Sequence, residues 1–228
     1  MLVKICGITS EEDALLAVAL GADAVGFLFA PSTRQVSPQA VDRIISRLPR
    51  EILTVGVFRD ESPKRVVQIV NGIGLRAAQL HGAESTADSC YVAERVPLVI
   101  KAFPAGHPDV ARSEEFGAQA VLVDGPSPGS GQVFEWRLAE GVVDPSRLIV
   151  SGGLNPKNVG DAIAHLHPFG VDVSTGVEAS PGSKDPRKVR EFIAAARAAS
   201  GEDMSDAGSP GPEGDAEGTD NPFDWRDD

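Results

Sequence analysis

The chain has 228 residues, 42% of them hydrophobic, and a formal net charge of −12. Ten acidic residues and one base lie in residues 201–228, so the other 200 residues carry only −3 and contain no basic stretch of the kind that nucleic-acid binding requires. No apolar run approaches the roughly 18 residues of a membrane span, and two cysteines without a CxxC pair fit a reducing compartment. With no signal-peptide pattern at the N-terminus, we expect a cytoplasmic protein that binds neither nucleic acid nor membrane.

Short apolar runs alternate with helix-like stretches along the chain. They are rich in Val, Ile and Leu, as strands buried on both faces are. We predict strands over Leu2–Cys6, Ala24–Phe29, Leu53–Phe58, Ala77–Leu80, Leu98–Ala102, Ala120–Asp124, Leu148–Ser151 and Val171–Ser174. Helix starts are predicted at the capping box Thr9-x-x-Glu12 and at Ser37-Pro38, Ser62-Pro63 and Asp185-Pro186, and helix ends at Gly21 and Gly72.

Eight β-then-α units in about 200 residues predict a single (β/α)8 TIM barrel over residues 1–199. A doubly wound open sheet is the alternative. Such a sheet usually has a Gly-rich turn after its first strand, whereas this chain has Gly7-Ile8-Thr9-Ser10 there, which is no dinucleotide-binding fingerprint.

Residues 200–228 are different in composition. Glu202–Asp220 is built of Gly, Pro, Ser, Asp and Glu with almost nothing apolar, which predicts a disordered acidic tail. Two aromatics near the end, Phe223 and Trp225, leave a docking peptide as the alternative to a solvated tail. The low lysine content, six of 21 bases, fits either a high-salt cytoplasm or GC-rich coding.

Two predicted strands end on groups that can exchange protons. Cys6 ends the first strand, with Lys4 two residues back on the same side, where an ammonium would favour the thiolate. Asp124 ends the sixth strand. Because barrel active sites lie at the carboxyl ends of the strands, we predict that a thiol and a carboxylate there act as general base and general acid. The alternatives are a buried inert thiol and an Asp-Gly turn.

Glycine-rich loops follow the last two predicted strands. They are Ser151-Gly152-Gly153-Leu154-Asn155-Pro156 and Ser174-Thr175-Gly176-Val177-Glu178. Glycines let backbone N–H groups approach an anion, and these are the loops at which such barrels bind phosphate. Tight turns alone are the alternative, but their occurrence in both loops favours phosphate.

Arg34 follows the second strand and can bind a carboxylate with its guanidinium, although an ordinary surface arginine would look the same. His81 ends the fourth strand as polar lining or a proton carrier. The other histidines, at positions 107, 165 and 167, have no metal-ligand spacing, and we predict no metal site.

Taken together, these motifs resemble the phosphoribosylanthranilate isomerases of tryptophan biosynthesis. The resemblance covers residues 1–199 and excludes the tail. The matching segments are Lys4–Ile8, Gly26–Phe29 with Arg34 and Ser37-Pro38, Val55–Phe58, Gln79–Gly82, Asp124-Gly125, Gly129–Trp136, Ser151–Leu154, and Val171–Glu178 with Pro181-Gly182 and Lys184-Asp185. One departure is Thr33, where the family commonly has a proline before the arginine.

The resemblance implies an Amadori rearrangement of N-(5-phosphoribosyl)anthranilate to the 1-(2-carboxyphenylamino)-1-deoxyribulose 5-phosphate ketose. It implies Asp124 as the acid that opens the sugar ring and Cys6 as the base that removes the proton on carbon 2. Arg34 would hold the anthranilate carboxylate, with His81 also at the substrate. The loops with Gly152, Gly153, Ser174, Thr175 and Gly176 would hold the phosphate. No cofactor is implied, and the partner is the small-molecule substrate, bound by a monomer or homodimer.

Other interpretations stay open at this point. The analogous isomerase of histidine biosynthesis would use two aspartates, and a ribulose-phosphate epimerase would need metal-binding histidines. A non-catalytic barrel that binds a phosphorylated metabolite is a rival of another class. A redox-sensing Cys6 would want a resolving cysteine, and Cys90 is expected in the fourth helix, in the core and out of reach.

Overall fold

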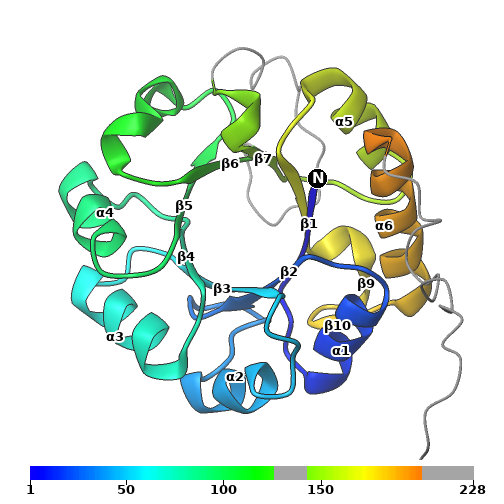
Figure 1. Cartoon of the computed structure of the whole chain (residues 1–228), viewed down its shortest axis with the longest axis horizontal. Helices are drawn as coiled ribbons and strands as arrows, with labels where there is room; N and C mark the ends of the chain where they lie inside the picture. The colour runs from blue at the N-terminus through cyan, green and yellow to red at the C-terminus, as the bar shows by residue number, and fades with distance from the viewer. Residues whose placement is uncertain (126–142, 202–228) are drawn as a thin grey trace, which may run out of the picture.

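The computed structural model describes residues 1–125 and 143–201. Eight parallel strands form a closed barrel in the order of the sequence, with the helices around its outside (Figure 1). The strands are β1 Leu2–Cys6, β2 Ala24–Leu28, β3 Leu53–Phe58, β4 Ala77–Leu80, β5 Val99–Pro104, β6 Ala120–Asp124, β7 Leu148–Val150 and β8 Gly170–Val173. Closure occurs between β1 and β8, where Lys4 pairs in register with Asp172. The predicted TIM barrel is confirmed, and the open-sheet alternative is wrong.

The helices follow the strands as the sequence pattern predicts. The α-helices are α1 Glu11–Ala19, α2 Pro38–Ile45, α3 Pro63–Ile73, α4 Thr86–Ala93, α5 Val159–Leu166 and α6 Pro186–Ser200. The 3-10 segments are η1 Pro108–Phe116, η3 Pro145–Arg147 and η4 Thr175–Val177, and a hairpin joins β9 Glu178–Ser180 to β10 Ser183–Lys184. Helix α6 continues through Ser200, one residue beyond the predicted domain boundary. The predicted segment Gly129–Trp136 and the tail from residue 202 lie outside the described residues.

The predicted strand limits agree closely with the structure. Four predicted strands, β1, β3, β4 and β6, have the observed bounds, and the others differ by one or two residues at one or both ends. The connection between β5 and β6 is the 3-10 segment η1, which is interrupted by non-helical backbone at Arg112.

The helix caps were predicted less well. Ser37 and Asp185 cap α2 and α6 with their side chains, as predicted. The capping box at Thr9 is wrong: Ser10 accepts from the Asp13 N–H, and the Thr9 hydroxyl instead donates to the Gly182 carbonyl. Ser62 occupies the N-cap position of α3 without a side-chain bond to the helix.

The two predicted helix ends had opposite outcomes. Gly21 follows α1 with a φ of 96°, so its prediction is confirmed. Gly72 lies inside α3, and the left-handed residue that ends this helix is Gly74, with a φ of 74°. Gly72 and Gly74 are two residues apart, and only the backbone geometry shows which of them ends the helix.

The barrel interior changes character along its axis. An apolar cluster fills the interior toward the amino ends of the strands; its members are Val55, Ala77, Ile100, Ala102, Ala120, Leu122 and Ile149. Toward the carboxyl ends, the buried side chains of Lys4, Gln79, Asp124 and Asp172 are polar or charged. Burying charges is costly unless they are paired, so this layer marks the functional end.

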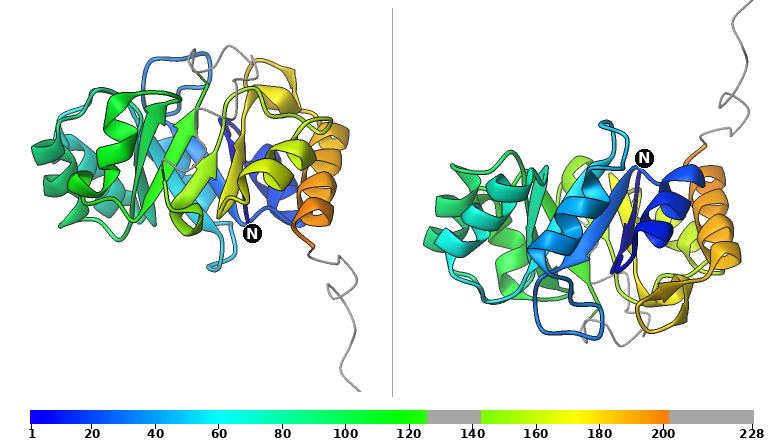
Figure 2. Two further views of the ribbon diagram at one scale, coloured as in Figure 1. Left: turned by 90° about the horizontal axis from the view of Figure 1, so that it is seen from above. Right: turned by 90° about the horizontal axis from the view of Figure 1, so that it is seen from below.

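The two ends of the barrel are well separated in the side views. The loop after β2 and the β9–β10 hairpin lie at one end, and the N-terminus lies at the other (Figure 2). A search of the described residues finds no helix long and apolar enough to cross a membrane.

Candidate active site

A cavity of about 820 Å³ opens at the carboxyl ends of the strands. Eight of the nine predicted site residues line it: Cys6, Arg34, His81, Asp124, Gly152, Gly153, Ser174 and Thr175. Gly176 is not among the lining residues. The fold thus brings together groups from six different strand–loop connections, as a barrel mouth should.

Cys6 lies against a buried ammonium. Lys4, two residues earlier on the same face of β1, is fully buried and donates to Asp172 over 2.8 Å. The Cys6 thiol packs so close to β2 that a Cβ on Gly26 would lie 2.7 Å from its sulfur. Any larger residue at position 26 would collide with the sulfur. Glycine at this position of β2 therefore leaves room for the thiol.

Burial and charge act in opposite directions on the thiol. Burial raises the pKa of Cys6 above its ordinary value, and the Lys4 ammonium opposes that rise. Burial also acts to lower the pKa of Lys4, but Asp172 and Cys6 outweigh it and leave that pKa raised. Lys4 therefore stays charged beside Cys6 and stabilises the thiolate whenever it forms.

Asp124 is held by two donors at the end of β6. Its Oδ1 accepts from the Gly125 N–H over 2.8 Å, and its Oδ2 lies 3.2 Å from His81 Nε2. The other ring nitrogen of His81 lies 2.8 Å from Gln79 Nε2. When Gln79 donates to Nδ1, the neutral ring carries its proton on Nε2 and donates it to Asp124.

Gln79 is the buried member of this chain of contacts. It is 1% exposed, and its Oε1 has no hydrogen-bond partner in the part of the chain that the structure describes. Gln79 also lines the cavity. A buried acceptor without a partner costs free energy, and a donor on a bound ligand would relieve that cost.

The two glycine-rich loops pack directly on each other and on β6. A Cβ on Gly152 would clash with the Gly125 backbone and lie 2.9 Å from Asp124 Oδ1. A Cβ on Gly176 would collide with the Leu154 carbonyl oxygen. Gly152 and Gly153 both have positive φ, at 86° and 69°. Close packing therefore already requires two of these glycines, and it also leaves backbone groups exposed to the cavity.

Arg34 has a partner that the sequence analysis did not predict. Its Nε and Nη2 each donate over 2.7 Å to the two carboxylate oxygens of Glu178. Lys184 donates to the same carboxylate and to the Ser174 carbonyl, both over 3.1 Å. The sequence shows Glu178 and Lys184 as two oppositely charged residues six positions apart beside the second glycine-rich loop, and no spacing rule connects them to Arg34.

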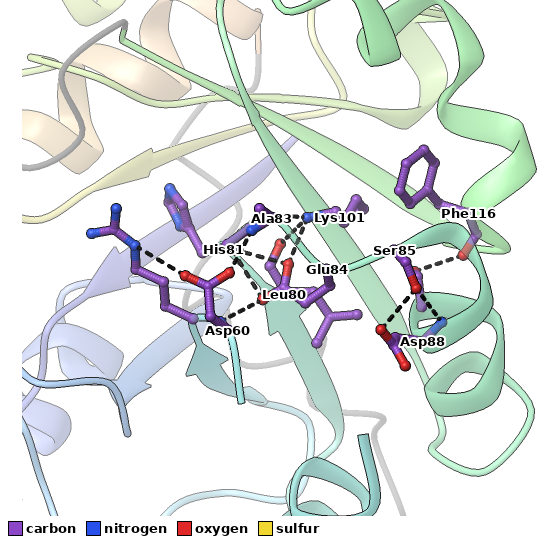
Figure 3. Close-up of polar contacts among 12 residues, drawn as sticks. Asp60, Leu80, His81, Ala83, Glu84, Ser85, Asp88, Lys101 and Phe116 are labelled. Atoms are coloured by element: carbon purple, nitrogen blue, oxygen red, sulfur yellow. Dashed lines mark hydrogen bonds and ion pairs between the residues drawn. The ribbon is translucent and has the colours of Figure 1, made fainter. Parts of the chain in front are cut away.

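Lys101 and Glu84 form another buried ion pair, next to His81. Lys101 donates to Glu84 over 2.7 Å and to the Gly82 carbonyl over 2.8 Å, and Glu84 accepts from the Asp60 and Gly82 N–H groups. Figure 3 shows these side chains gathered beside His81. Asp60 has a φ of 54°, and a Cβ on Gly82 would clash with it. The cluster fixes the loop that begins with His81.

Other predicted features lie outside this site. No group of three or more His, Cys, Asp or Glu side chains suited to a metal ion occurs among residues 1–125 and 143–201. Cys90 lies in α4 as predicted, but it is only partly buried and donates to the Glu115 carbonyl, so its prediction as a core residue is wrong.

Comparison with known proteins gives consistent results. The family model described as N-(5'-phosphoribosyl)anthranilate (PRA) isomerase matches residues 3–195. The N-(5'-phosphoribosyl)anthranilate isomerase of Desulforudis audaxviator is 50% identical over 205 residues, covering 87% of this chain and 98% of that protein.

Solved structures give the same result. The phosphoribosyl anthranilate isomerase of Thermus thermophilus superposes with a TM-score of 0.80 at 41% identity, covering 87% of this chain and 99% of that one. A phosphoribosyl anthranilate isomerase in complex with reduced 1-(o-carboxyphenylamino)-1-deoxyribulose 5-phosphate has a TM-score of 0.76 at 42% identity, covering 87% and 100%.

Proposed function

Because the chain belongs to the N-(5'-phosphoribosyl)anthranilate isomerase family, we propose that its cavity performs the isomerisation with Cys6 as general base and Asp124 as general acid. The activity is the Amadori rearrangement of the phosphoribosyl aminoaldose to the aminoketose in tryptophan biosynthesis. The observation that carries the residue assignment is that a thiol beside an ammonium and a carboxylate beside an imidazole line one cavity.

The first step opens the sugar. Protonated Asp124 donates to the furanose ring oxygen, the bond between that oxygen and carbon 1 breaks, and the anthranilate nitrogen forms a Schiff base with carbon 1. The protonated imine is the electron sink for the next step. His81, 3.2 Å from Asp124 Oδ2, stabilises the carboxylate that remains.

The second step moves a proton from carbon 2. The Cys6 thiolate removes it, the electron pair moves into the imine, and an enolamine forms. The enolamine gains a proton at carbon 1 and loses one from its hydroxyl to give the aminoketone. Each positioned acid or base typically contributes about 10²–10⁴-fold in rate.

Binding is assigned to the rest of the cavity. Arg34 binds the anthranilate carboxylate, since a guanidinium has the geometry for it. The loops with Gly152, Gly153, Ser174, Thr175 and Gly176 bind the phosphate through backbone N–H groups. His81 contacts the substrate as well. A relative of 42% identity binds reduced 1-(o-carboxyphenylamino)-1-deoxyribulose 5-phosphate, a compound that carries both a carboxylate and a phosphate, which supports a cavity with a site for each.

The test compares three variants by the loss of substrate fluorescence. Cys6→Ala and Asp124→Asn should each lower kcat by about 10²–10⁴-fold while remaining folded. Cys90→Ala is the matched control, because that thiol lies in α4, away from the cavity, and its loss should leave kcat unchanged. Folded variants with near-normal turnover would refute the assignment.

A pH profile adds a second test. Burial raises the pKa of Cys6, and only its thiolate is a base, so kcat/KM should rise with pH as the thiol deprotonates. Lys4→Met should move that rise to higher pH, because the ammonium that opposes the shift is gone. An unchanged profile in Lys4→Met would mean that another group limits the rate.

The remaining assignments concern the molecule as a whole. We propose that residues 1–199 are the catalytic domain, which the family match over residues 3–195 supports, and that residues 200–228 form an acidic tail outside it. A chain shortened after Gly201 should keep full kcat.

We propose a cytoplasmic location on the basis of the pathway. Analytical ultracentrifugation would decide whether the protein is a monomer or a homodimer.

A further inference from the structure

Glu178 holds one edge of the guanidinium that faces the cavity. Both of its oxygens accept from Arg34, through Nε and Nη2, over 2.7 Å. The side chains of Arg34 and Glu178 are only 16% and 6% exposed. This two-point contact fixes the plane of the guanidinium as well as its position.

The opposite edge of the same guanidinium is left open. An arginine side chain has five N–H donors, and the two bonds to Glu178 use one on Nε and one on Nη2. The other three, both on Nη1 and one on Nη2, have no hydrogen-bond partner within the described ranges. Arg34 lines the cavity, whereas Glu178 is not among the lining residues. The open edge is therefore the part of Arg34 available to a ligand.

Glu178 is itself held firmly from its own hairpin. Lys184, whose side chain is fully buried, bonds to Glu178 Oε1 and to the carbonyl of Ser174 in the proposed phosphate loop. Lys188 donates to the Glu178 carbonyl over 2.7 Å. Burial acts to raise the pKa of Glu178, but the bonds from Arg34 and Lys184 hold that pKa below its ordinary value. Glu178 is therefore ionised at neutral pH.

The aliphatic part of the Arg34 side chain packs against Gly7. A Cβ on Gly7 would lie 2.8 Å from Arg34 Cδ and 2.8 Å from Ser174 Oγ, and Gly7 has a φ of 76°. The stem thus crosses directly over the residue that follows Cys6. Gly7 therefore leaves the space that the arginine stem occupies in this position.

We propose that Glu178 is a positioning residue that presents the free edge of Arg34 to the aromatic carboxylate of the substrate. This inference rests on the proposed role of Arg34. Because Glu178 orders the arginine when the protein folds, binding the substrate does not have to order it. Glu178 thus sets specificity for an ortho-carboxylated aryl amine without touching the substrate.

The test uses two substrates that differ only in the carboxylate. They are N-(5-phosphoribosyl)anthranilate and N-(5-phosphoribosyl)aniline, with both ketose products followed by chromatography. Glu178→Gln should raise KM for the anthranilate substrate about tenfold, equal to roughly 1.4 kcal/mol, and change its kcat less than about twofold. KM for the aniline substrate should not change, because that substrate has no carboxylate to align.

The chain offers a matched control on its surface. Glu115 makes the same two-point contact with Arg112, through Nε and Nη2, but both side chains are exposed. Glu115→Gln should leave KM unchanged for both substrates. If Glu178→Gln does not fold, Glu178→Asp is the second variant. It keeps the negative charge but shortens the side chain by one methylene group, which moves the carboxylate away from Arg34, and it should show the same selective rise in KM.

The outcomes distinguish the positioning role of Glu178 from the carboxylate-binding role of Arg34 on which it rests. A rise in KM of equal size for both substrates, or a fall in kcat alone, would mean that Glu178 supports the site only generally and would overturn the positioning role. Arg34→Met tests the premise. If that variant treats the two substrates no differently from the intact chain, Arg34 does not bind the carboxylate. If Arg34→Met raises KM for the anthranilate substrate alone but Glu178→Gln does not, only the positioning role fails.

Discussion

Two of the ion pairs beside the cavity, Lys101 with Glu84 and Arg34 with Glu178, differ in whether the cation has N–H donors left over. Lys101 gives its three N–H groups to Glu84 and to the carbonyls of Leu80 and Gly82. Arg34 uses two of its five on Glu178. A saturated buried cation can only hold the structure in place, whereas an unsaturated one at a cavity wall can also bind an anion.

Lys101, Glu84 and Arg34 all line the cavity, but the two cations reach it from different parts of the barrel. Lys101 lies between Ile100 and Ala102, which face the barrel interior, so its side chain points to the helix side. There its ammonium lies 5.2 Å from the ring centre of Phe103 and 5.9 Å from that of Phe116. Arg34 comes from the loop after β2 and reaches the cavity. The first pair fixes the loop that carries His81, and the second presents a binding group.

The largest effect is expected from removing the saturated cation. Lys101→Met should lower the free energy of unfolding by about 3–5 kcal/mol, because Glu84 would stay buried with no cation beside it. Denaturant unfolding of the intact chain and the variant measures this. Arg112→Met, which removes an exposed cation from an ion pair, is the control and should leave stability nearly unchanged.

A double variant sharpens the same comparison. Lys101→Met with Glu84→Leu removes the buried charge and should recover part of the loss. Recovery should stop about 1–3 kcal/mol short, because the Asp60 and Gly82 N–H groups then lose their acceptor. If the single variant costs less than the double one, the ion pair does not behave as a coupled unit.

A smaller effect is expected from the equivalent change in the second network. Lys184→Met should cost about 1–3 kcal/mol in unfolding free energy, less than Lys101→Met, because Glu178 keeps its two bonds from Arg34. The same denaturant experiment measures it. An equal or larger loss would contradict the view that Arg34 alone suffices to compensate the Glu178 charge.

The sequence predicted the barrel and most of the cavity because both depend on local patterns. Strand ends follow from apolar runs, and the barrel fold places all of those ends at one mouth, so Cys6, His81 and Asp124 had to meet. The partners of Lys4 and Arg34 depend instead on contacts across more than a hundred positions. Lys4 with Asp172 and Arg34 with Glu178 are joined only by closure of the barrel. The misplaced cap at Thr9 has the same cause, since Gly182 takes its hydroxyl.

The smallest effect expected is a pH dependence of stability that comes from the Glu178 carboxylate. The pKa of Glu178 is held below its ordinary value by Arg34 and Lys184, against the effect of burial. A carboxyl with a lowered folded-state pKa stabilises fully above its unfolded pKa of about 4.3, and the stabilisation fades as pH falls below that. The stability lost in Glu178→Gln should therefore be largest near pH 7 and shrink toward pH 3. Denaturant unfolding at pH 7, 5, 4 and 3 would measure that difference. A deficit that stays constant with pH would mean that Glu178 contributes through packing rather than through its charge, and the open edge of Arg34 would then need another explanation for its orientation.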